Sequence, residues 1–288
     1  MRLYIDGAWF KDEHGRTVHL RGVNLGGSNK VPVQPPGATH IREGFFEHEN
    51  ISFVGRPFPL EDADEHFERL RHWGMRLIRL PITWEAIEHA GPGVYDEAFL
   101  DYIAAIVEKA GEYDMKVFID AHQDVWSRFS GGDGAPGWTL EKVGLDMQSF
   151  HLNGAALTHQ MHGDPFPRMI WASNYSKLAA STMFTLFFAG NDFAPQTMID
   201  DVPVQEFLQT HYINAFKQVA LRVRDMPHVI GYDAINEPFH GFIGVKDLNG
   251  LHSNIRIGAM PTPIQSMALG HGISQDVADW QITPLGPR

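Results

Sequence analysis

The chain has 288 residues, of which 43% are apolar and 20% are charged, a composition typical of a globular protein. Its formal net charge of −12 argues against a nucleic-acid partner, since polyanions are bound through clustered basic residues. The chain contains no cysteine, which excludes disulfides and thiolate metal sites. The first residues lack an apolar stretch of signal-peptide length, and no run reaches the roughly 20 apolar residues that span a bilayer. We therefore expect a cytoplasmic protein.

The first sixty residues predict a β-hairpin, a strand and a long loop. Residues 3–10 and 16–20 are typical of two short strands joined by a tight turn. Residues 20–25 predict a third strand, which leads into a glycine-rich loop with Lys30 just past it. Residues 31–60 contain many proline, glycine and aromatic residues without a clear period, which indicates a loop.

Strands and helices then alternate along the chain. A helix is predicted over 61–73, a strand over 75–81, a helix over 96–110 with Asp96 as its N-cap, and a strand over 115–122. The connections between the strands are too long for hairpins. This pattern predicts a parallel sheet with right-handed crossovers.

Residues 123–202 interrupt this alternation, and within them only 176–189 has a helical period. So long a loop is expected after a strand of a barrel when the loop is functional. A helix over 203–223 and a buried strand over 229–236 follow. The segment after Glu237 contains no convincing further strand–helix unit.

Polar residues end every predicted strand at the same end of the sheet. These residues are Lys30, Arg79, Asp120, His122, Asp124, Asn236 and Glu237. Because side chains alternate along a strand, Asp120, His122 and Asp124 should share one face. The chemistry of a (β/α) barrel is carried at these carboxyl ends, so we predict the functional site there.

These motifs, in this order, resemble the family 5 glycoside hydrolases, a retaining (β/α)8 TIM-barrel family. The stretch Asp133–Trp138 resembles the endoglycoceramidase branch, and Ile257–Pro263 resembles fungal members that cleave glucosylceramide or steryl β-glucosides. The resemblance implies an α/β fold with an N-terminal hairpin and a long loop after the third strand. It also implies one barrel domain over residues 1–288, of which only the first half, about four βα units, is present and which is incomplete at its C-terminus.

The resemblance implies roles for the strand-end residues. Glu237 would be the general acid/base, and Asn236 would hydrogen-bond the sugar 2-hydroxyl. Arg79 would keep the carboxylates of the site ionised, and His122 would form a polar wall of the sugar pocket.

The resemblance also implies how the substrate is held. Lys30 and Asp124 would bind sugar hydroxyls, while Trp138 and Trp171 would either wall the sugar or lipid site or anchor buried loops. No metal and no cofactor are implied. The expected partner is a small-molecule glycoside or glycolipid, which also suggests peripheral membrane contact.

The chain departs from this family in one respect. Retaining hydrolysis uses two carboxyl groups about 5–5.5 Å apart, and the family's nucleophile is a glutamate on the seventh strand. No glutamate follows Glu237 in this sequence. We therefore expect a fragment that is inactive alone and that associates with itself through the open edge of the half-barrel.

Two other classes of function remain open. One is a metal-dependent hydrolase that uses Asp120, His122, Asp124 and Glu237 to hold a divalent ion, which loss of activity on chelation would indicate. The other is a non-catalytic carbohydrate- or glycolipid-binding remnant, which would bind a β-glucoside without turnover.

Overall fold

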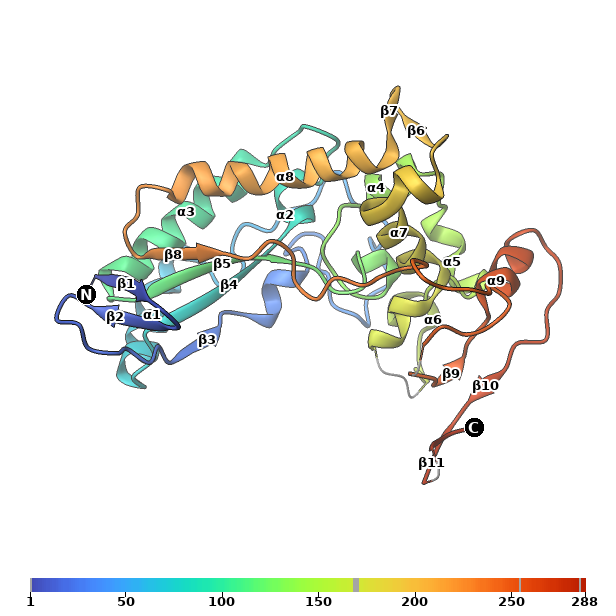
Figure 1. The fold of residues 1–288 in the computed structure, drawn as a ribbon, viewed down its shortest axis with the longest axis horizontal. Coiled ribbons are helices and arrows are strands. Elements are labelled where there is room, and N and C mark those ends of the chain that lie inside the picture. Colours follow the sequence, from blue (N-terminus) through green and yellow to red (C-terminus); the bar gives the residue numbers. More distant parts are fainter. Residues whose placement is uncertain (1, 168–170, 254, 285) are drawn as a thin grey trace.

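The computed structural model describes residues 2–167, 171–253, 255–284 and 286–288. Its centre is a four-stranded parallel sheet with the order β3-β4-β5-β8 (Figure 1). The strands are β3 (Gly22–Asn24), β4 (Leu77–Thr83), β5 (Lys116–His122) and β8 (Val229–Tyr232). Their spatial order follows the chain, and helices lie in each crossover, so the predicted parallel βα arrangement is confirmed.

Three helices of the crossovers lie around the sheet (Figure 1). They are α1 (Ala63–His72), α3 (Glu97–Glu112) and α8 (Val204–Val223), and a short helix, α2 (Trp84–Glu88), directly follows β4. Helices α3 and α8 lie side by side over one face of the sheet (Figure 1). Asp96 caps α3 as predicted, because its side chain accepts a hydrogen bond from the Phe99 amide at 2.9 Å. The apolar stripe of α3 is buried along its whole length.

The N-terminal hairpin is present, but its turn lies earlier in the chain than the sequence predicted. Strand β1 (Leu3–Asp6) pairs with β2 (Trp9–Asp12) across a two-residue turn. The predicted strand at 16–20 is absent, and only Thr17 forms an isolated bridge. The Asp12 carboxylate accepts hydrogen bonds from the amides of residues 14 and 16, which bends the chain away from strand geometry.

The fourth strand is shorter and more exposed than the sequence predicted. It ends at Tyr232, whose side chain is 49% exposed, rather than continuing buried to residue 236. The strand pairs with β5 on one side, and in the described ranges no strand pairs with its other side. An apolar run therefore indicated a strand correctly but overestimated its burial, because burial of this strand depends on a further neighbour.

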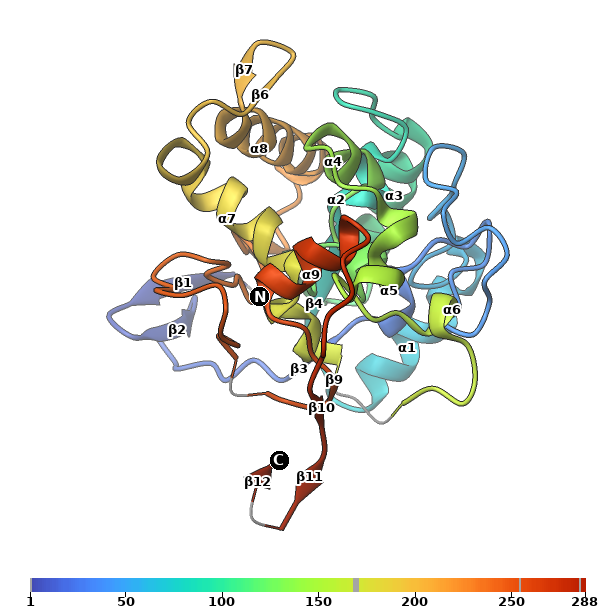
Figure 2. The same ribbon diagram turned by 90° about the vertical axis from the view of Figure 1, so that its right-hand side faces the viewer.

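The long loop after β5 contains more helix than its sequence indicated. Besides α7 (Leu178–Phe193), it holds α4 (Gly137–Lys142), α5 (Phe150–Asn153) and α6 (His159–His162). Figure 2 looks onto this end of the molecule, with these helices and α9 (Pro263–Gly270) gathered around it. The short helices span one or two turns, too few to show a period. Helix α9 was missed although Thr262 and Gln265 form a capping box before it.

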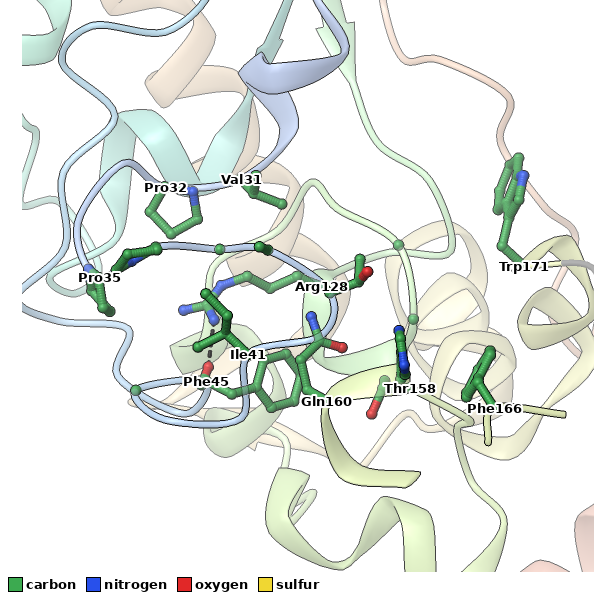
Figure 3. A pocket seen from close by; sticks show the side chains of 18 of the residues that line it. Val31, Pro32, Pro35, Ile41, Phe45, Arg128, Thr158, Gln160, Phe166 and Trp171 are labelled. Carbon is green, nitrogen blue, oxygen red and sulfur yellow. Dashed lines mark hydrogen bonds between the residues drawn. The ribbon is translucent and has the colours of Figure 1, made fainter. Parts of the chain in front are cut away.

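The remaining elements are short. They are the 3-10 helices η1 (Gly27–Lys30), η2 (Leu60–Asp62), η3 (Arg128–Ser130), η4 (Met147–Ser149) and η5 (Trp171–Ser176), and the two-residue strands β6 (Met198–Ile199), β7 (Val202–Pro203), β9 (Gly258–Ala259), β10 (Asp279–Trp280), β11 (Ile282–Thr283) and β12 (Gly286–Pro287). Parts of the segments 31–45 and 157–166, together with Trp171, line much of a cavity of about 330 Å³ (Figure 3). No helix in the described part of the chain is both long enough and apolar enough to cross a membrane.

Candidate active site

A hydrogen-bonded network joins β4, β5 and the segment that follows β8. Arg79 was predicted to end its strand, but β4 continues past it to Thr83, so Arg79 lies within the strand. The Arg79 guanidinium on β4 lies 2.8 Å from the Asp120 carboxylate on β5 and donates to the Asn236 side chain, past the end of β8, at 2.7 Å. The Asn236 amide in turn donates to the Gln123 carbonyl at 3.0 Å. Asp120 is fully buried, so Arg79 supplies the positive charge that such a carboxylate needs. The predicted gathering of these residues at one edge of the sheet is observed.

His122 connects this network to a second group of charges. Its Nδ1 lies 2.8 Å from Asp120 and its Nε2 lies 3.4 Å from Asp124, so the three side chains share one face as predicted. Burial lowers the pKa of His122, but the hydrogen bonds to Asp120 and Asp124 outweigh it and raise the pKa to about 9. With carboxylates at both ring nitrogens, the imidazole is held as a cation at neutral pH.

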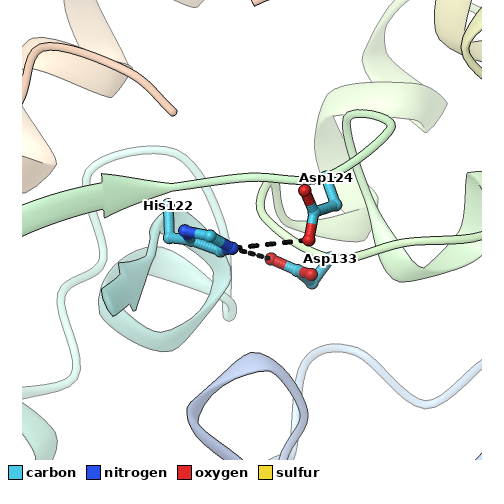
Figure 4. A group of neighbouring side chains, drawn as sticks. All are labelled: His122, Asp124 and Asp133. Carbon is cyan, nitrogen blue, oxygen red and sulfur yellow. Dashed lines mark hydrogen bonds and ion pairs between the residues drawn. The ribbon is translucent and has the colours of Figure 1, made fainter. Parts of the chain in front are cut away.

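Lys30 is the centre of the second group. Its ammonium forms an ion pair with Asp124 and lies 3.6 Å from the Asp133 carboxylate. Burial raises the pKa of Asp133 to about 8, against the lowering effect of the Lys30 charge. Figure 4 shows His122, Asp124 and Asp133 converging, and Asp133 Oδ1, 3.9 Å from His122 Nε2, has no hydrogen-bond partner in the described structure. A buried acceptor without a partner is suited to a ligand hydroxyl.

Asp133 was not predicted as a site residue from the sequence. An antiparallel bridge between Asp124 and Asp133 brings it there, with amide-to-carbonyl hydrogen bonds of 3.0 and 2.9 Å. The only available signal was its place in the Asp133–Trp138 stretch, which resembles the glycolipid-hydrolase branch.

The backbone directly after Asp124 is strained. Val125 and Trp126 have φ angles of 53° and 77°, a region that side-chain-bearing residues rarely adopt, β-branched residues least of all. The Gln123 side chain stabilises this turn by accepting a hydrogen bond from the Trp126 amide at 2.9 Å. Strain of this kind collects at functional sites, where it aims neighbouring side chains.

Glu237 follows Asn236 in a third unusual backbone conformation, with a φ of 38°. Its carbonyl accepts hydrogen bonds from the Gln123 side chain at 3.0 Å and the Tyr175 hydroxyl at 3.2 Å. The residue is exposed, and its carboxylate forms no hydrogen bond or ion pair with the residues that the structure describes. Its backbone is thus fixed beside the network while its carboxylate remains accessible.

The two tryptophans have different environments. Trp138 is 4% exposed, packs against Trp84 with ring centroids 5.3 Å apart, and donates to the Glu88 carbonyl at 2.7 Å. It is a buried loop anchor, so we do not retain it as a substrate-binding residue. Trp171 is 45% exposed and lines the cavity between the loops.

The cluster also has the donor set of a divalent-ion site. Ligand atoms of His122, Asp124 and Asp133 lie within 4.8 Å of one another. This set differs from the one predicted for a metal-dependent hydrolase, because Asp120 pairs with Arg79 and Glu237 lies outside the group. The Lys30 ammonium already contacts both aspartates, and a metal ion would have to displace it.

A parallel βα sheet that gathers buried charges and a hydrogen-bonded amide at the carboxyl ends of its strands is the architecture of a TIM-barrel enzyme. The comparison with protein families agrees with this class. The model of Cellulase (glycosyl hydrolase family 5) matches residues 41–255, and the chain belongs to this family.

Relatives of known activity are much longer than this chain. A glucosylceramidase of Rhizopus delemar is 50% identical over 279 residues, which cover 94% of this chain and 41% of the relative. An ergosteryl-beta-glucosidase of Saccharomyces cerevisiae is 38% identical, over 96% of this chain and 40% of its own length. The crystal structure of Cryptococcus neoformans sterylglucosidase 1 superposes with a TM-score of 0.94 at 43% identity, over 100% of this chain and 42% of that one. The chain therefore spans about 40% of the curated relatives that it matches.

Proposed function

We propose that this chain provides the acid/base half of a retaining hydrolase for β-glucosides of lipids, namely glucosylceramides or steryl glucosides. One observation carries the proposal: Arg79, His122 and Asn236 meet in one network at the strand ends, directly beside Glu237. The names of the relatives support the substrate class, because they include glucosylceramidases and an ergosteryl-beta-glucosidase.

The charged cluster supports recognition of the sugar. Lys30 can donate to sugar hydroxyls, and the carboxylates of Asp124 and Asp133 can accept from them. A sugar that lacks a matching hydroxyl would leave a buried polar group without a partner, at a cost of about 1–3 kcal/mol. We therefore propose that these three residues select the glucosyl group.

The reaction needs a proton donor and a nucleophile. Glu237 would protonate the glycosidic oxygen and later deprotonate water, while Asn236, held by Arg79, would position the sugar 2-hydroxyl. No glutamate follows Glu237 in this sequence. We propose that the nucleophilic carboxylate is not among these 288 residues, and that the chain alone binds a β-glucoside without hydrolysing it.

A chimera tests this function directly. Residues 1–288 are joined to the part of the Rhizopus delemar glucosylceramidase that lies beyond the region of similarity, and hydrolysis of glucosylceramide is measured. The chimera is expected to be active, and Glu237→Gln is expected to lower kcat by about 10²–10⁴-fold. Lys109→Met is the control, since Lys109, near the far end of α3, pairs with the exposed carboxylates of Asp64 and Glu112.

The other outcomes reject particular parts of the proposal. An active chimera that Glu237→Gln leaves unchanged would remove the acid/base assignment. A folded chimera that binds methyl β-glucoside without turnover would favour the non-catalytic remnant. Loss of activity with a chelator, and recovery with a divalent ion, would favour the metal-dependent hydrolase.

We also propose two further interactions of the chain, one with itself and one with a membrane surface. We propose that the chain associates with itself through the outer edge of β8, which no described strand pairs. We also propose that it meets its lipid-linked substrate at a membrane surface.

A further inference from the structure

The side chain of Gln123 lies between the two segments that carry the site. It is 4% exposed and directly follows the last residue of β5. Its Nε2 donates to the Asn236 carbonyl at 2.6 Å and to the Glu237 carbonyl at 3.0 Å, while its Oε1 accepts from the Trp126 amide at 2.9 Å. Because carbonyls require a donor and an amide requires an acceptor, these partners fix the orientation of the side-chain amide.

Both segments that Gln123 joins have backbone conformations that need support. Val125 and Trp126 on one side have φ angles of 53° and 77°, and Glu237 on the other has a φ of 38°. Each such residue costs on the order of 1–3 kcal/mol and persists only where its surroundings hold it. The hydrogen bonds of Gln123 therefore stabilise both conformations and hold the two segments in place relative to one another.

The Tyr175 hydroxyl is a second donor to the Glu237 carbonyl, at 3.2 Å. Tyr175 belongs to η5, and its ring packs against Phe184 of α7 with centroids 5.8 Å apart. Its hydroxyl lies 3.5 Å from Gln123 Nε2, although the two residues are 52 positions apart in the chain. The Glu237 carbonyl is thus held from two separate points of the long loop after β5.

The Glu237 carboxylate depends on these contacts for its position. It forms no hydrogen bond or ion pair with the residues that the structure describes, so its direction follows from the backbone to which it is attached. A displacement of about 1 Å at a reacting group can cost about 10²-fold in rate. Hydrogen bonds to the carbonyl of Glu237 therefore decide where its carboxyl group can reach.

We infer that Gln123 and Tyr175 are positioning residues that hold Glu237 for proton transfer to the glycosidic oxygen, an inference that rests on the proposed function. In that step the bond between the sugar carbon and the oxygen breaks as the Glu237 carboxyl gives its proton to the leaving oxygen. An alkoxide is a strong base and must be protonated as it leaves, whereas 2,4-dinitrophenolate is a weak base and leaves without a proton. The two residues should therefore matter only for the first kind of leaving group.

The 288-residue chain provides a spectroscopic test. The ¹³C signal of the Glu237 carboxyl, assigned with Glu237→Gln, is followed by NMR while methyl β-D-glucoside is added. The wild-type signal is expected to shift on binding. In Gln123→Glu, which keeps an acceptor for the Trp126 amide but loses the donor to the two carbonyls, and in Tyr175→Phe, the glucoside should still bind while this shift is lost.

The chimera with the Rhizopus delemar glucosylceramidase provides a kinetic test. The ratio kcat/KM, which reports the step that releases the leaving group, is measured for glucosylceramide and for 2,4-dinitrophenyl β-D-glucoside. Gln123→Glu is expected to lower kcat/KM for glucosylceramide by about 10²-fold, and Tyr175→Phe by about tenfold, the effect of one hydrogen bond. Both variants should cleave the dinitrophenyl glucoside at the wild-type rate.

Two matched substitutions serve as controls. Gln148→Glu makes the same change of charge at an exposed position on η4, and Tyr113→Phe removes a hydroxyl that donates to the exposed Asp64. Both are expected to leave the NMR shift and the rates with both substrates unchanged.

Every other outcome rejects a stated part of the argument. Equal losses with the two substrates would show that Gln123 and Tyr175 only maintain the fold, and would overturn the inference. Wild-type rates with glucosylceramide, or an undiminished Glu237 shift in both variants, would overturn it and leave the proposed function standing. If Gln123→Glu does not fold, Tyr175→Phe decides by the same criteria. A wild-type chain that does not bind methyl glucoside, with a chimera inactive on both substrates, rejects the proposed function and the inference with it.

Discussion

The buried carboxylates at the strand ends are neutralised by three cations that come from different elements. The carboxylates are those of Asp120 and Asp124, and the cations are Arg79, His122 and Lys30. Asp133 lies beside Lys30, and burial raises its pKa to about 8. Removal of one partner from a buried ion pair leaves an uncompensated charge, whereas removal of both can be nearly neutral. Single substitutions in this group should therefore cost more stability than matched pairs.

Arg79→Met is expected to lower the free energy of unfolding by about 3–5 kcal/mol, because Asp120 is left buried without its guanidinium. Urea unfolding measures this change. Adding Asp120→Asn should recover part of the loss, since residue 120 then no longer carries a buried charge that His122 alone must compensate. Arg224→Met, which breaks an exposed pair with Asp225, should change stability by less than about 1 kcal/mol. Equal losses in the two arginine variants would show that Asp120 does not depend on Arg79.

Stability should fall as the pH rises from about 6.5 to about 9. The pKa of His122 is raised in the folded protein, so its contribution is complete below the unfolded value near 6.5 and is lost through about 9. The raised pKa of Asp133 acts in the same direction, because the folded protein keeps a proton up to about pH 8 that the unfolded chain has released. Thermal unfolding should show a loss of about 3 kcal/mol from His122 across this window. Identical pH profiles for the wild type and His122→Gln would contradict this assignment.

At the scale of elements, the sequence predicted the features that periodicity or neighbouring residues determine. It did not predict the features that depend on contacts between residues distant in the chain. The period of α3 and its Asp96 cap could be read from neighbouring residues, and both are observed. The alternation in strand β5 placed Asp120, His122 and Asp124 on one face. Asp133 could not be placed, because a bridge across the eight residues 125–132, of which Val125, Trp126 and Gly131 have positive φ, brings it to Asp124.

The bridge between Asp124 and Asp133 leaves no space for a side chain at residue 132. A Cβ on Gly132 would lie 2.0 Å from the Asp124 carbonyl oxygen, so Gly132→Ala must separate the two segments. We expect a loss of about 1–3 kcal/mol in stability, as for other overpacked sites, and weaker binding of methyl β-glucoside because Asp133 moves away from Lys30. Gly270→Ala is the matched control, since a Cβ there would meet only Asn153 at 3.5 Å. Unfolding curves and glucoside titrations of both variants check this, and equal behaviour of the two would show that the bridge is not needed.

At the scale of the whole molecule, the four-stranded sheet has the strand order of the first half of a barrel and two unpaired edges in the described ranges. The motifs predicted this arrangement, because they follow one another in chain order on or after successive strands. Burial of the fourth strand was predicted wrongly from its apolar run alone. A run of valine and isoleucine shows what a strand can bury, whereas the neighbouring strands decide how much of it is buried.

The open edge predicts self-association of the chain. Tyr232 on β8 is 49% exposed, and Ile213 on α8, next to the Tyr212 that donates to the Ala234 carbonyl, is 63% exposed. An unpaired strand edge with exposed apolar residues favours pairing with another chain. Sedimentation velocity over a range of concentrations should show dimers or larger species. The double substitution Tyr232→Lys with Ile213→Lys should shift the equilibrium towards the monomer and raise the Kd of association by about tenfold or more.

Trp73→Lys, a change to an equally exposed residue just after α1, should leave the Kd unchanged. A wild-type chain that stays monomeric at high concentration, or a Trp73→Lys effect as large as that of the edge variants, would show that the outer side of β8 is not the contact.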